Sequence, residues 1–204
     1  MTDGCNGRKR VGQRGVSTAE LIVTTAVTGV LVLMGVPMVD DARRAAELNR
    51  SAAQIHGLLV RCRAVAVMRS RMCAVVFDRE ADGSWRCVVA EDGDGDGIRR
   101  SDIGSGVDPT VGPTLSLDAG AAGPGILAGP VPDPTGSGAL GGDPADPIRA
   151  GRGNIISFSA RGTATPSSVF LTDRSRRMVA LRVYGGTGRI NRIRWQRGWG
   201  EWKK

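Results

Sequence analysis

The sequence predicts an α+β protein in which one long N-terminal helix packs on a C-terminal antiparallel β-domain. About the first third of the chain combines an apolar run with a stripe of apolar residues at helical spacing, which is typical of one extended helix. From residue 72 onward apolar and polar residues alternate, as they do in half-buried strands. The 204 residues are 41% hydrophobic and 24% charged, which is the composition of a folded protein.

The first element is an apolar segment, residues 16–39, that is long enough to cross a membrane. Glu20 is its only charged residue, and as a helix rising about 1.5 Å per residue it spans a hydrocarbon core of roughly 30 Å. Basic residues precede the segment and acidic ones follow it, so the positive-inside rule predicts a cytoplasmic N-terminus and an outer domain from residue 40. The basic residues are Arg8, Lys9, Arg10 and Arg14, and the acidic ones are Asp40 and Asp41.

Two simpler interpretations of this segment explain less. The stretch VLMGVPMVDDA, residues 32–42, offers no good small-residue cleavage site for ordinary signal peptidase, which disfavours a removable secretory signal. A plain single-pass anchor is the other alternative. It leaves Glu20 unexplained, because a carboxylate gains nothing in a lone membrane helix.

The apolar spacing after Pro37 predicts that residues 40–71 continue the helix as an amphipathic segment. Apolar residues recur at alternating steps of three and four, which places them in one stripe. The stripe consists of Ala45, Leu48, Ala52, Ile55, Leu59, Cys62 and Ala66. We expect this stripe to pack on the β-domain, residues 72–204.

Six strands are predicted in the β-domain. Residues 72–79 and 84–91 form a hairpin, and its inward faces hold one set of alternating residues from each strand: Cys73, Val75 and Phe77 with Trp85, Cys87 and Val89. The later strands are residues 154–160, 167–173, 177–184 and 188–195. Between them, residues 104–153 are rich in Gly, Pro and Asp, which predicts a long mobile loop with short edge strands near 115–117 and 126–127.

The stretch RGVSTAELIV, residues 14–23, resembles the class III signal of type IV prepilins. This resemblance implies that a basic leader, residues 1–15, is cleaved after Gly15 by prepilin peptidase, and that Val16 becomes a methylated N-terminus. Glu20 is then the fifth mature residue, which in this family pairs with the N-terminal amine of a neighbouring subunit during assembly. The chain departs from the family pattern in having Val16 in place of the usual Phe.

The whole chain outside residues 104–153 resembles the type II secretion pseudopilin H and FimT-like family. The C-terminal part of this resemblance depends on Ile156, Phe158 and Gly162 in an I-x-F-x-x-x-G pattern, with Gly188 and Arg189 near the end. It implies a single-pass protein of the bacterial inner membrane that joins other pilins or pseudopilins in a filament. Prepilin peptidase/methyltransferase is then one partner, and secreted substrate, other minor subunits or DNA are partners of the outer domain.

The four cysteines do not predict a metal centre, because none forms a CxxC pair and His56 is the one histidine. Cys5 lies in the leader, which leaves Cys62, Cys73 and Cys87. Two arrangements remain open, namely one disulfide with one buried thiol, or three reduced and buried thiols.

The stretch DGDGDG, residues 92–97, opens like a calcium-binding loop. Asp92, Asp94 and Asp96 occupy loop positions that supply oxygen ligands for Ca²⁺. The bidentate acid expected at the twelfth position is absent, since that residue is Ile103. The alternative is a solvated acidic turn between strands, which we favour.

The C-terminus interleaves cations with indoles, which suggests DNA binding as an alternative function. Cations bind phosphates and indoles stack on bases. The residues concerned are Arg189, Arg192, Arg194, Arg197 and Trp195. The competing interpretation is an ordinary edge strand with solvated arginines.

The net charge and the motif content narrow the function further. A net charge of +8 suits an anionic partner such as nucleic acid or a lipid surface, although the leader contributes part of it. With one histidine, no G-x-S-x-G and no phosphate-binding loop, the sequence predicts no catalytic centre. The expected function is therefore structural, in assembly or binding.

Overall fold

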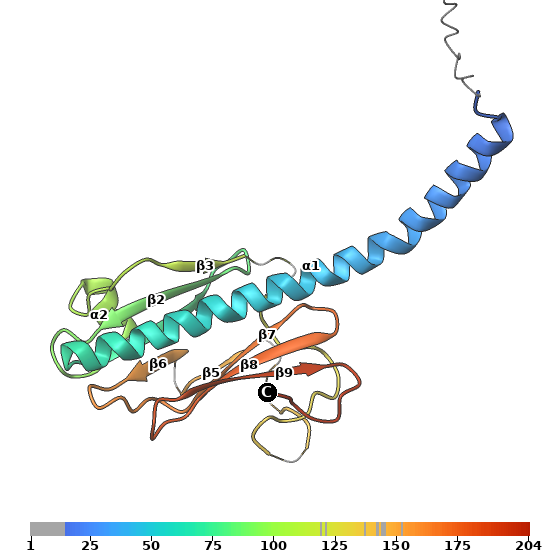
Figure 1. Ribbon diagram of the computed structural model, residues 1–204. Helices are drawn as coiled ribbons and strands as arrows, with labels where there is room; N and C mark the ends of the chain where they lie inside the picture. Colours follow the sequence, from blue (N-terminus) through green and yellow to red (C-terminus); the bar gives the residue numbers. More distant parts are fainter. Residues whose placement is uncertain are drawn as a thin grey trace, which may run out of the picture. The chain divides into compact units, whose positions relative to one another are not determined.

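The computed structural model describes residues 15–118, 120, 122–136, 138–141, 143, 146–151 and 153–204, with backbone alone at 32–35. The predicted leader up to residue 14 lies outside these described residues. The chain divides into two compact units, Met1–Asp41 and Ala42–Lys204. It has one long N-terminal apolar helix and a C-terminal antiparallel β-domain (Figure 1), so the predicted α+β class is confirmed.

The long helix α1 comprises Thr18–Arg69 and contains Pro37. The hydroxyl oxygen of Ser17 accepts a hydrogen bond from the Ala19 amide at 3.3 Å, and the Ser17 carbonyl accepts one from the Leu21 amide. Ser17 is thus placed to satisfy donors that a helix N-terminus otherwise leaves free. The predicted amphipathic stripe is confirmed from Leu48 to Ala66, because its six members in this range are buried.

The first sheet has the strand order β3-β2-β1-β6, and all its pairs are antiparallel. Its strands are β1 (Cys73–Arg79), β2 (Trp85–Glu91), β3 (Leu115–Leu117) and β6 (Ile155–Phe158). The predicted hairpin is confirmed as β1 and β2, with Val75 opposite Val89 in the register.

The second sheet has the order β4-β7-β8-β9, and β5 also pairs with β7. Its strands are β4 (Gly123–Pro124), β5 (Ile148–Arg149), β7 (Ser167–Thr172), β8 (Arg177–Val183) and β9 (Ile190–Gln196). In the view of Figure 1, β2 and β3 lie on one side of the C-terminal part of α1 and β7 to β9 on the other.

One main core joins the helix stripe to the inward faces of both sheets. Its members include Ile55 and Leu59 of α1, Phe77 of β1, Phe158 of β6 and Leu181 of β8, all essentially inaccessible to solvent. Alternate residues of each strand face this core, as the period of two requires. Residues on the other faces of the two sheets form two smaller apolar clusters.

The first smaller cluster lies on the outer face of the second sheet. Phe170, Met178, Ala180 and Trp195 gather there with Leu127 and Val131 of the preceding loop, and Trp199 and Trp202 pack beside them. The second cluster lies on the outer face of the first sheet and includes Val76, Ala90 and Ile98.

The prediction for residues 104–153 is wrong in part. This tract contains β3, β4 and β5, each of which pairs with a longer strand, and helix α2 (Arg100–Ser105) extends into its beginning. The predicted edge strand at 115–117 is confirmed, whereas the one predicted at 126–127 lies instead at Gly123–Pro124. Strands β4 and β5 contain two residues each, which is too short for an alternating pattern to identify.

Candidate functional site

The first candidate site is the N-terminal end of α1, where the predicted processing and assembly residues lie. Gly15 precedes the helix, and a Cβ added there would meet no atom within 4 Å. Val16 is 72% exposed and Glu20 lies exposed in the first helical turn. A carboxylate in this turn is favoured by the positive end of the helix dipole. In the part of the chain that the structure describes, no cation pairs with Glu20.

The apolar half of α1 presents its side chains outward. Every residue between 18 and 31 and between 36 and 39 is exposed, and α1 is the one helix among the described residues that is long and apolar enough to cross a membrane. The hydroxyls of Thr24, Thr25 and Thr28 donate to helix carbonyls three or four residues earlier, at 2.7 to 3.0 Å. These threonines therefore bring no unsatisfied donor to an apolar environment.

Two glycines of the C-terminal motif meet in the folded domain. Gly188 has a φ of +57°, and a Cβ there would lie 2.2 Å from the carbonyl oxygen of Gly162. Ile156 and Phe158 of the same motif are fully buried in the main core. Arg63 of α1 donates a hydrogen bond to the Thr187 carbonyl at 3.1 Å, which ties the helix to the same turn.

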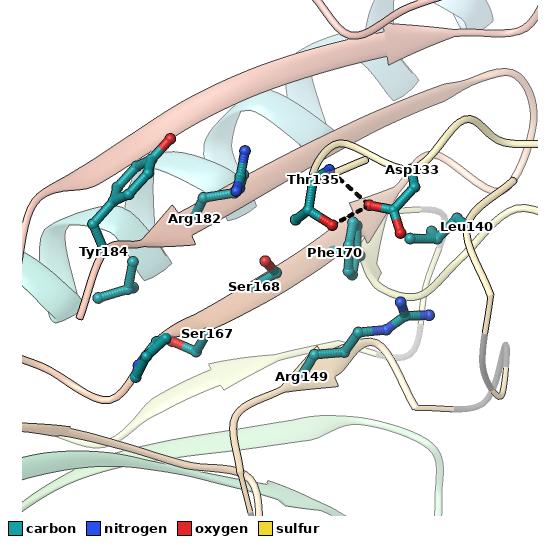
Figure 2. A pocket seen from close by; sticks show the side chains of 11 residues that line it. Asp133, Thr135, Leu140, Arg149, Ser167, Ser168, Phe170, Arg182 and Tyr184 are labelled. Atoms are coloured by element: carbon teal, nitrogen blue, oxygen red, sulfur yellow. Dashed lines mark hydrogen bonds between the residues drawn. The ribbon is translucent and has the colours of Figure 1, made fainter. Parts of the chain in front are cut away.

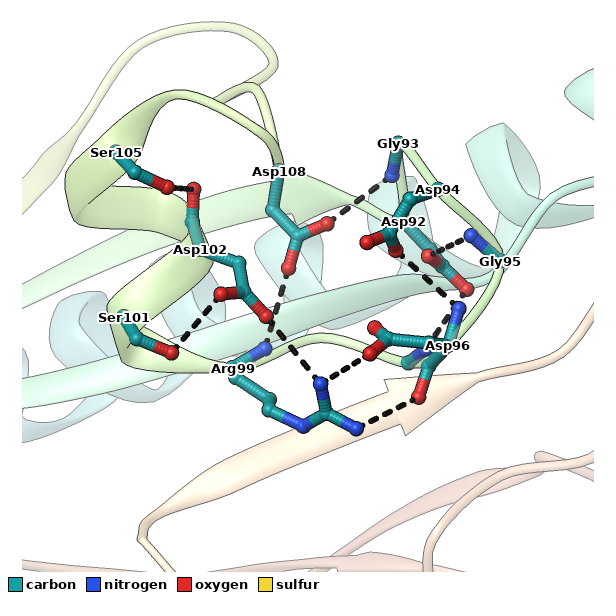
Figure 3. Close-up of polar contacts among 11 residues, drawn as sticks. Asp92, Gly93, Asp94, Gly95, Asp96, Arg99, Ser101, Asp102, Ser105 and Asp108 are labelled. Carbon is teal, nitrogen blue, oxygen red and sulfur yellow. Dashed lines mark hydrogen bonds and ion pairs between the residues drawn. The ribbon is translucent and has the colours of Figure 1, made fainter.

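The acidic loop after β2 brings its three predicted carboxylates together (Figure 3). Ligand oxygens of Asp92, Asp94 and Asp96 all lie within 4.8 Å of one another. The Asp92 carboxylate accepts the amides of Gly95 and Gly97, at 2.8 and 3.3 Å. The Asp96 amide donates to Asp94 at 3.2 Å and lowers the pKa of that carboxyl group.

Residues that the sequence did not single out complete this loop. Asp108 is fully buried and accepts the amides of Gly93 and Arg99, at 3.0 and 3.2 Å. The Arg99 guanidinium pairs with Asp96. A Cβ at Gly93 would lie 1.9 Å from the Val107 carbonyl oxygen, so only glycine allows the two backbone segments to approach.

The structure supplies part of a calcium site at this loop. The three carboxylates offer oxygen ligands, but one of them already neutralises Arg99. Ile103, at the position of the expected bidentate acid, packs against the apolar cluster on the outer face of the first sheet. Calcium binding therefore stays a prediction, and the hydrogen bonds account for the loop as a structural turn.

The indoles of the C-terminal segment pack against the apolar cluster on the outer face of the second sheet. Trp195 is 5% exposed and donates its indole N–H to the Trp199 carbonyl at 2.8 Å. Trp202 donates to the Pro132 carbonyl at 2.6 Å, and its ring lies 6.4 Å from that of Trp195. Both indoles stabilise the apolar cluster, but only Trp195 is buried, whereas Trp202 is half-buried. The Trp195 ring therefore does not face solvent as base stacking requires.

The four arginines predicted as DNA contacts have different environments. Arg189, Arg194 and Arg197 are exposed, whereas Arg192 is half-buried and donates to the Asn49 side chain. Burial, together with the neighbouring Arg194, lowers the pKa of Arg192. DNA binding stays a prediction for which the exposed guanidinium groups are the remaining support.

The three cysteines of the β-domain and its helix are free thiols. Cys62, Cys73 and Cys87 are buried in the main core. Burial raises the pKa of Cys87 to about 12 and that of Cys73 to about 11. Of the two open arrangements, the structure has three buried thiols.

Comparisons of the chain with protein-family models, with characterised proteins and with solved structures find no match. The features of the chain that bear on its function are therefore its own residues, above all the exposed apolar half of α1 and Glu20.

Proposed function

We propose that this chain is a minor pilin or pseudopilin, a structural subunit of a type IV pilus or type II secretion pseudopilus. It is made as a single-pass protein of the inner membrane, trimmed after Gly15 and methylated at Val16. It then enters a filament through the N-terminal half of α1, and its β-domain meets other subunits or secreted substrate.

The observation that carries the proposal is the contrast within one continuous helix. Residues 18–31 and 36–39 expose all their side chains, while the same helix from Leu48 onward contributes buried residues to the main core. Full burial of one Val, Leu or Ile side chain is worth about 1.5–3 kcal/mol, so this exposed apolar surface requires lipid or other helices around it. A filament core of packed helices supplies such a cover after extraction from the membrane.

Glu20 gives this helix a role in assembly that a plain anchor lacks. A carboxylate in an apolar environment costs a few kcal/mol and is retained where an opposite charge meets it. Cleavage after Gly15 creates a positive amine at Val16, four residues from Glu20 in sequence. The amine of one subunit and the Glu20 carboxylate of the next then offset one another and set the register between subunits.

The convergence of Gly162 and Gly188 further supports the proposal. Both glycines belong to the motif on which the C-terminal resemblance depends. The Gly188 backbone approaches the Gly162 carbonyl too closely for a side chain at Gly188, and Gly162 has a φ of +78°, which favours glycine. The motif thus has a structural reason in this chain, because it closes the turn between β8 and β9 onto the segment after β6.

The experiment is an intact-mass measurement of the full chain produced in a bacterial membrane together with an active prepilin peptidase. We expect the loss of residues 1–15 and a gain of about 14 Da from one methyl group. Gly15→Val should block cleavage by placing a branched side chain beside the scissile bond. The matched control, Ser17→Ala, keeps Gly15 and should be processed normally. A wild-type mass that retains the leader in the presence of active peptidase contradicts the proposal.

A further inference from the structure

A cavity of about 280 Å³ opens on the outer face of the second sheet, beside Phe170 of the apolar cluster there. It lies between strands β5, β7 and β8 and the loop that contains Asp133 and Thr135 (Figure 2). Its lining includes two guanidinium groups, those of Arg149 and Arg182, together with the hydroxyl groups of Ser168 and Thr135. Neither the acidic loop nor the C-terminal arginines contribute to it.

The strand register places both arginines in one row with Ser168. Ser168 of β7 lies opposite Arg149 of β5 on one side and opposite Arg182 of β8 on the other. Directly paired residues project from the same face of a sheet, with Cβ atoms about 4.5–5.5 Å apart. Figure 2 shows the small Ser168 side chain between the two arginines. A small residue between two long cationic ones leaves room for a ligand.

Aromatic rings and backbone carbonyls hold both guanidinium groups in place. Arg149 lies over the Phe170 ring and Arg182 over the Tyr184 ring, each 5.3 Å from the ring centroid. Arg182 donates to the Pro134 carbonyl at 2.8 Å, and Arg149 donates to the Gly141 carbonyl. A guanidinium has five N–H donors, so each side chain keeps donors for a ligand while its position is fixed.

The charge balance of the cavity favours one additional negative charge. Across the residues that the structure describes, no carboxylate lies within 4.0 Å of either guanidinium. Asp133 is close enough to be influenced by both. The Thr135 hydroxyl and amide donate to it at 2.6 and 2.7 Å, and these bonds with the two arginines hold its pKa below its usual value. Two cations and one carboxylate leave a net charge of +1.

We propose that this cavity binds the carboxylate group of a small organic acid, with Arg149 and Arg182 as its cationic donors and Ser168 between them. The planar fork of arginine matches the two oxygens of a carboxylate. A singly charged carboxylate balances the net charge, whereas a phosphate dianion is repelled by Asp133. The volume is at the small end of the range for ligand pockets, which suits a ligand of few atoms.

The test is calorimetric titration of the full chain in detergent micelles near neutral pH. The probes are N-acetylalanine, its neutral amide and inorganic phosphate. We expect saturable one-to-one binding of N-acetylalanine and an affinity at least about tenfold lower for the amide and for phosphate. This comparison uses the unaltered protein, so it does not depend on whether a variant folds. Equal binding of acid and amide, or tighter binding of phosphate, would overturn the proposal.

Variants then assign the binding to this cavity. Arg149→Gln and Arg182→Gln should each weaken N-acetylalanine binding about tenfold or more, and Arg182→Lys, which keeps the charge and loses the fork, should lie between. Arg50→Gln removes the same charge from an exposed position of α1 and should change nothing. An equal loss with Arg50→Gln would mean that net charge alone attracts the acid, and would refute the site.

A short peptide with a free C-terminus identifies the source of the carboxylate. Binding weaker than that of N-acetylalanine supports a free organic acid as the ligand. Binding at least as tight assigns the cavity to a chain terminus and overturns the small-acid proposal. These outcomes are independent of leader cleavage, so the cavity and the filament function can fail separately.

Discussion

The two halves of helix α1 share one backbone and differ in what surrounds them. In the first half, up to Val39, apolar residues occupy all sides and every described side chain is exposed. In the second half, from Ala42 to Arg69, apolar residues form one stripe, and from Leu48 to Ala66 that stripe is buried in the main core. Among the described residues, the β-domain buries the stripe of the second half, whereas the described side chains of the first half are all exposed.

The two halves also differ in the partners of their polar side chains. The threonines of the first half turn their hydroxyls onto the helix's own carbonyls, as a water-free environment requires. The second half places charged side chains such as Arg43 and Glu47 on its outer face, where they pair with each other at 2.9 Å. The comparison favours the proposal that lipid or neighbouring helices surround the first half, and it shows that the second half packs on the β-domain.

The largest expected difference is in the reaction rates of thiols. It separates the thiols buried in the main core, including Cys62 of α1, from one placed on the exposed face of the second half of α1. Burial raises the pKa of Cys62 well above its usual value, and that of Cys87 from 9.0 to about 12. Only the thiolate reacts with a disulfide reagent. Near neutral pH we therefore expect Cys73, whose pKa is raised to about 11, to react about 100-fold more slowly than an exposed thiol, and Cys62 and Cys87 about 1000-fold or more slowly. The measurement is the reaction rate with Ellman's reagent in a Cys5→Ser background.

The matched variant is Val67→Cys, because Val67 is 49% exposed on the same helix. The introduced thiol should react rapidly, while the rate of the buried thiols should rise about tenfold per pH unit as the thiolate fraction grows. Since the fold raises these pKa values, folded protein should lose stability as the pH rises above 9.0. Cys5→Ser protein that keeps Val67, denatured without reductant, should yield three reactive thiols, namely those of Cys62, Cys73 and Cys87. A count of one reactive thiol in this protein would reveal a disulfide.

The second prediction compares leucines in the two halves. Leu59 is fully buried, so Leu59→Ala should lower the free energy of unfolding by about 2–5 kcal/mol. Leu31 is 65% exposed, so Leu31→Ala should change the stability of the β-domain by less than about 0.5 kcal/mol. Urea unfolding of the full chain in micelles, followed by tryptophan fluorescence, reports on the β-domain. Equal losses for the two variants would show that the β-domain also depends on the first half.

Much of this fold was predictable because its longer elements follow regular periods. The predicted ends of the six longer strands agree with the structure to within two residues, and the helix stripe is buried from Leu48, three residues after its predicted start at Ala45. The short strands β4 and β5 could not be predicted, since two residues carry no period. Their position depends on pairing with β7, which is a long-range contact that a local pattern does not encode.

The candidate sites were predictable to different degrees. The acidic loop was visible as DGDGDG, but Asp108 joins it from a distant position through two backbone amides. The burial of Trp195 could not be foreseen, because its partners come from the loop before β5 and from the chain end. The row of Arg149, Ser168 and Arg182 likewise exists only through strand register.

The smallest effects on stability are expected for the two glutamates of the helix, and they separate function from folding. Glu47 pairs with Arg43, which is 76% exposed, so Glu47→Gln should cost no more than about 0.5 kcal/mol. Glu20 lies in the first helical turn, where the dipole contribution is about 0.3–1 kcal/mol, so Glu20→Gln should also leave the β-domain folded. Both changes keep the side-chain size and remove one negative charge.

Assembly distinguishes the two variants, because the proposed function assigns to Glu20, and not to Glu47, the contact with the amine of a neighbouring subunit. Filament or oligomer content is measured by sedimentation and by crosslinking of membranes that contain prepilin peptidase. We expect Glu20→Gln to reduce assembly strongly while Glu47→Gln assembles like the unaltered chain. If the two variants assemble equally, the apolar half of α1 acts as an anchor alone and the charge at Glu20 has no part in joining subunits. If both lose assembly, the charge of the helix as a whole matters and the role assigned to Glu20 is wrong.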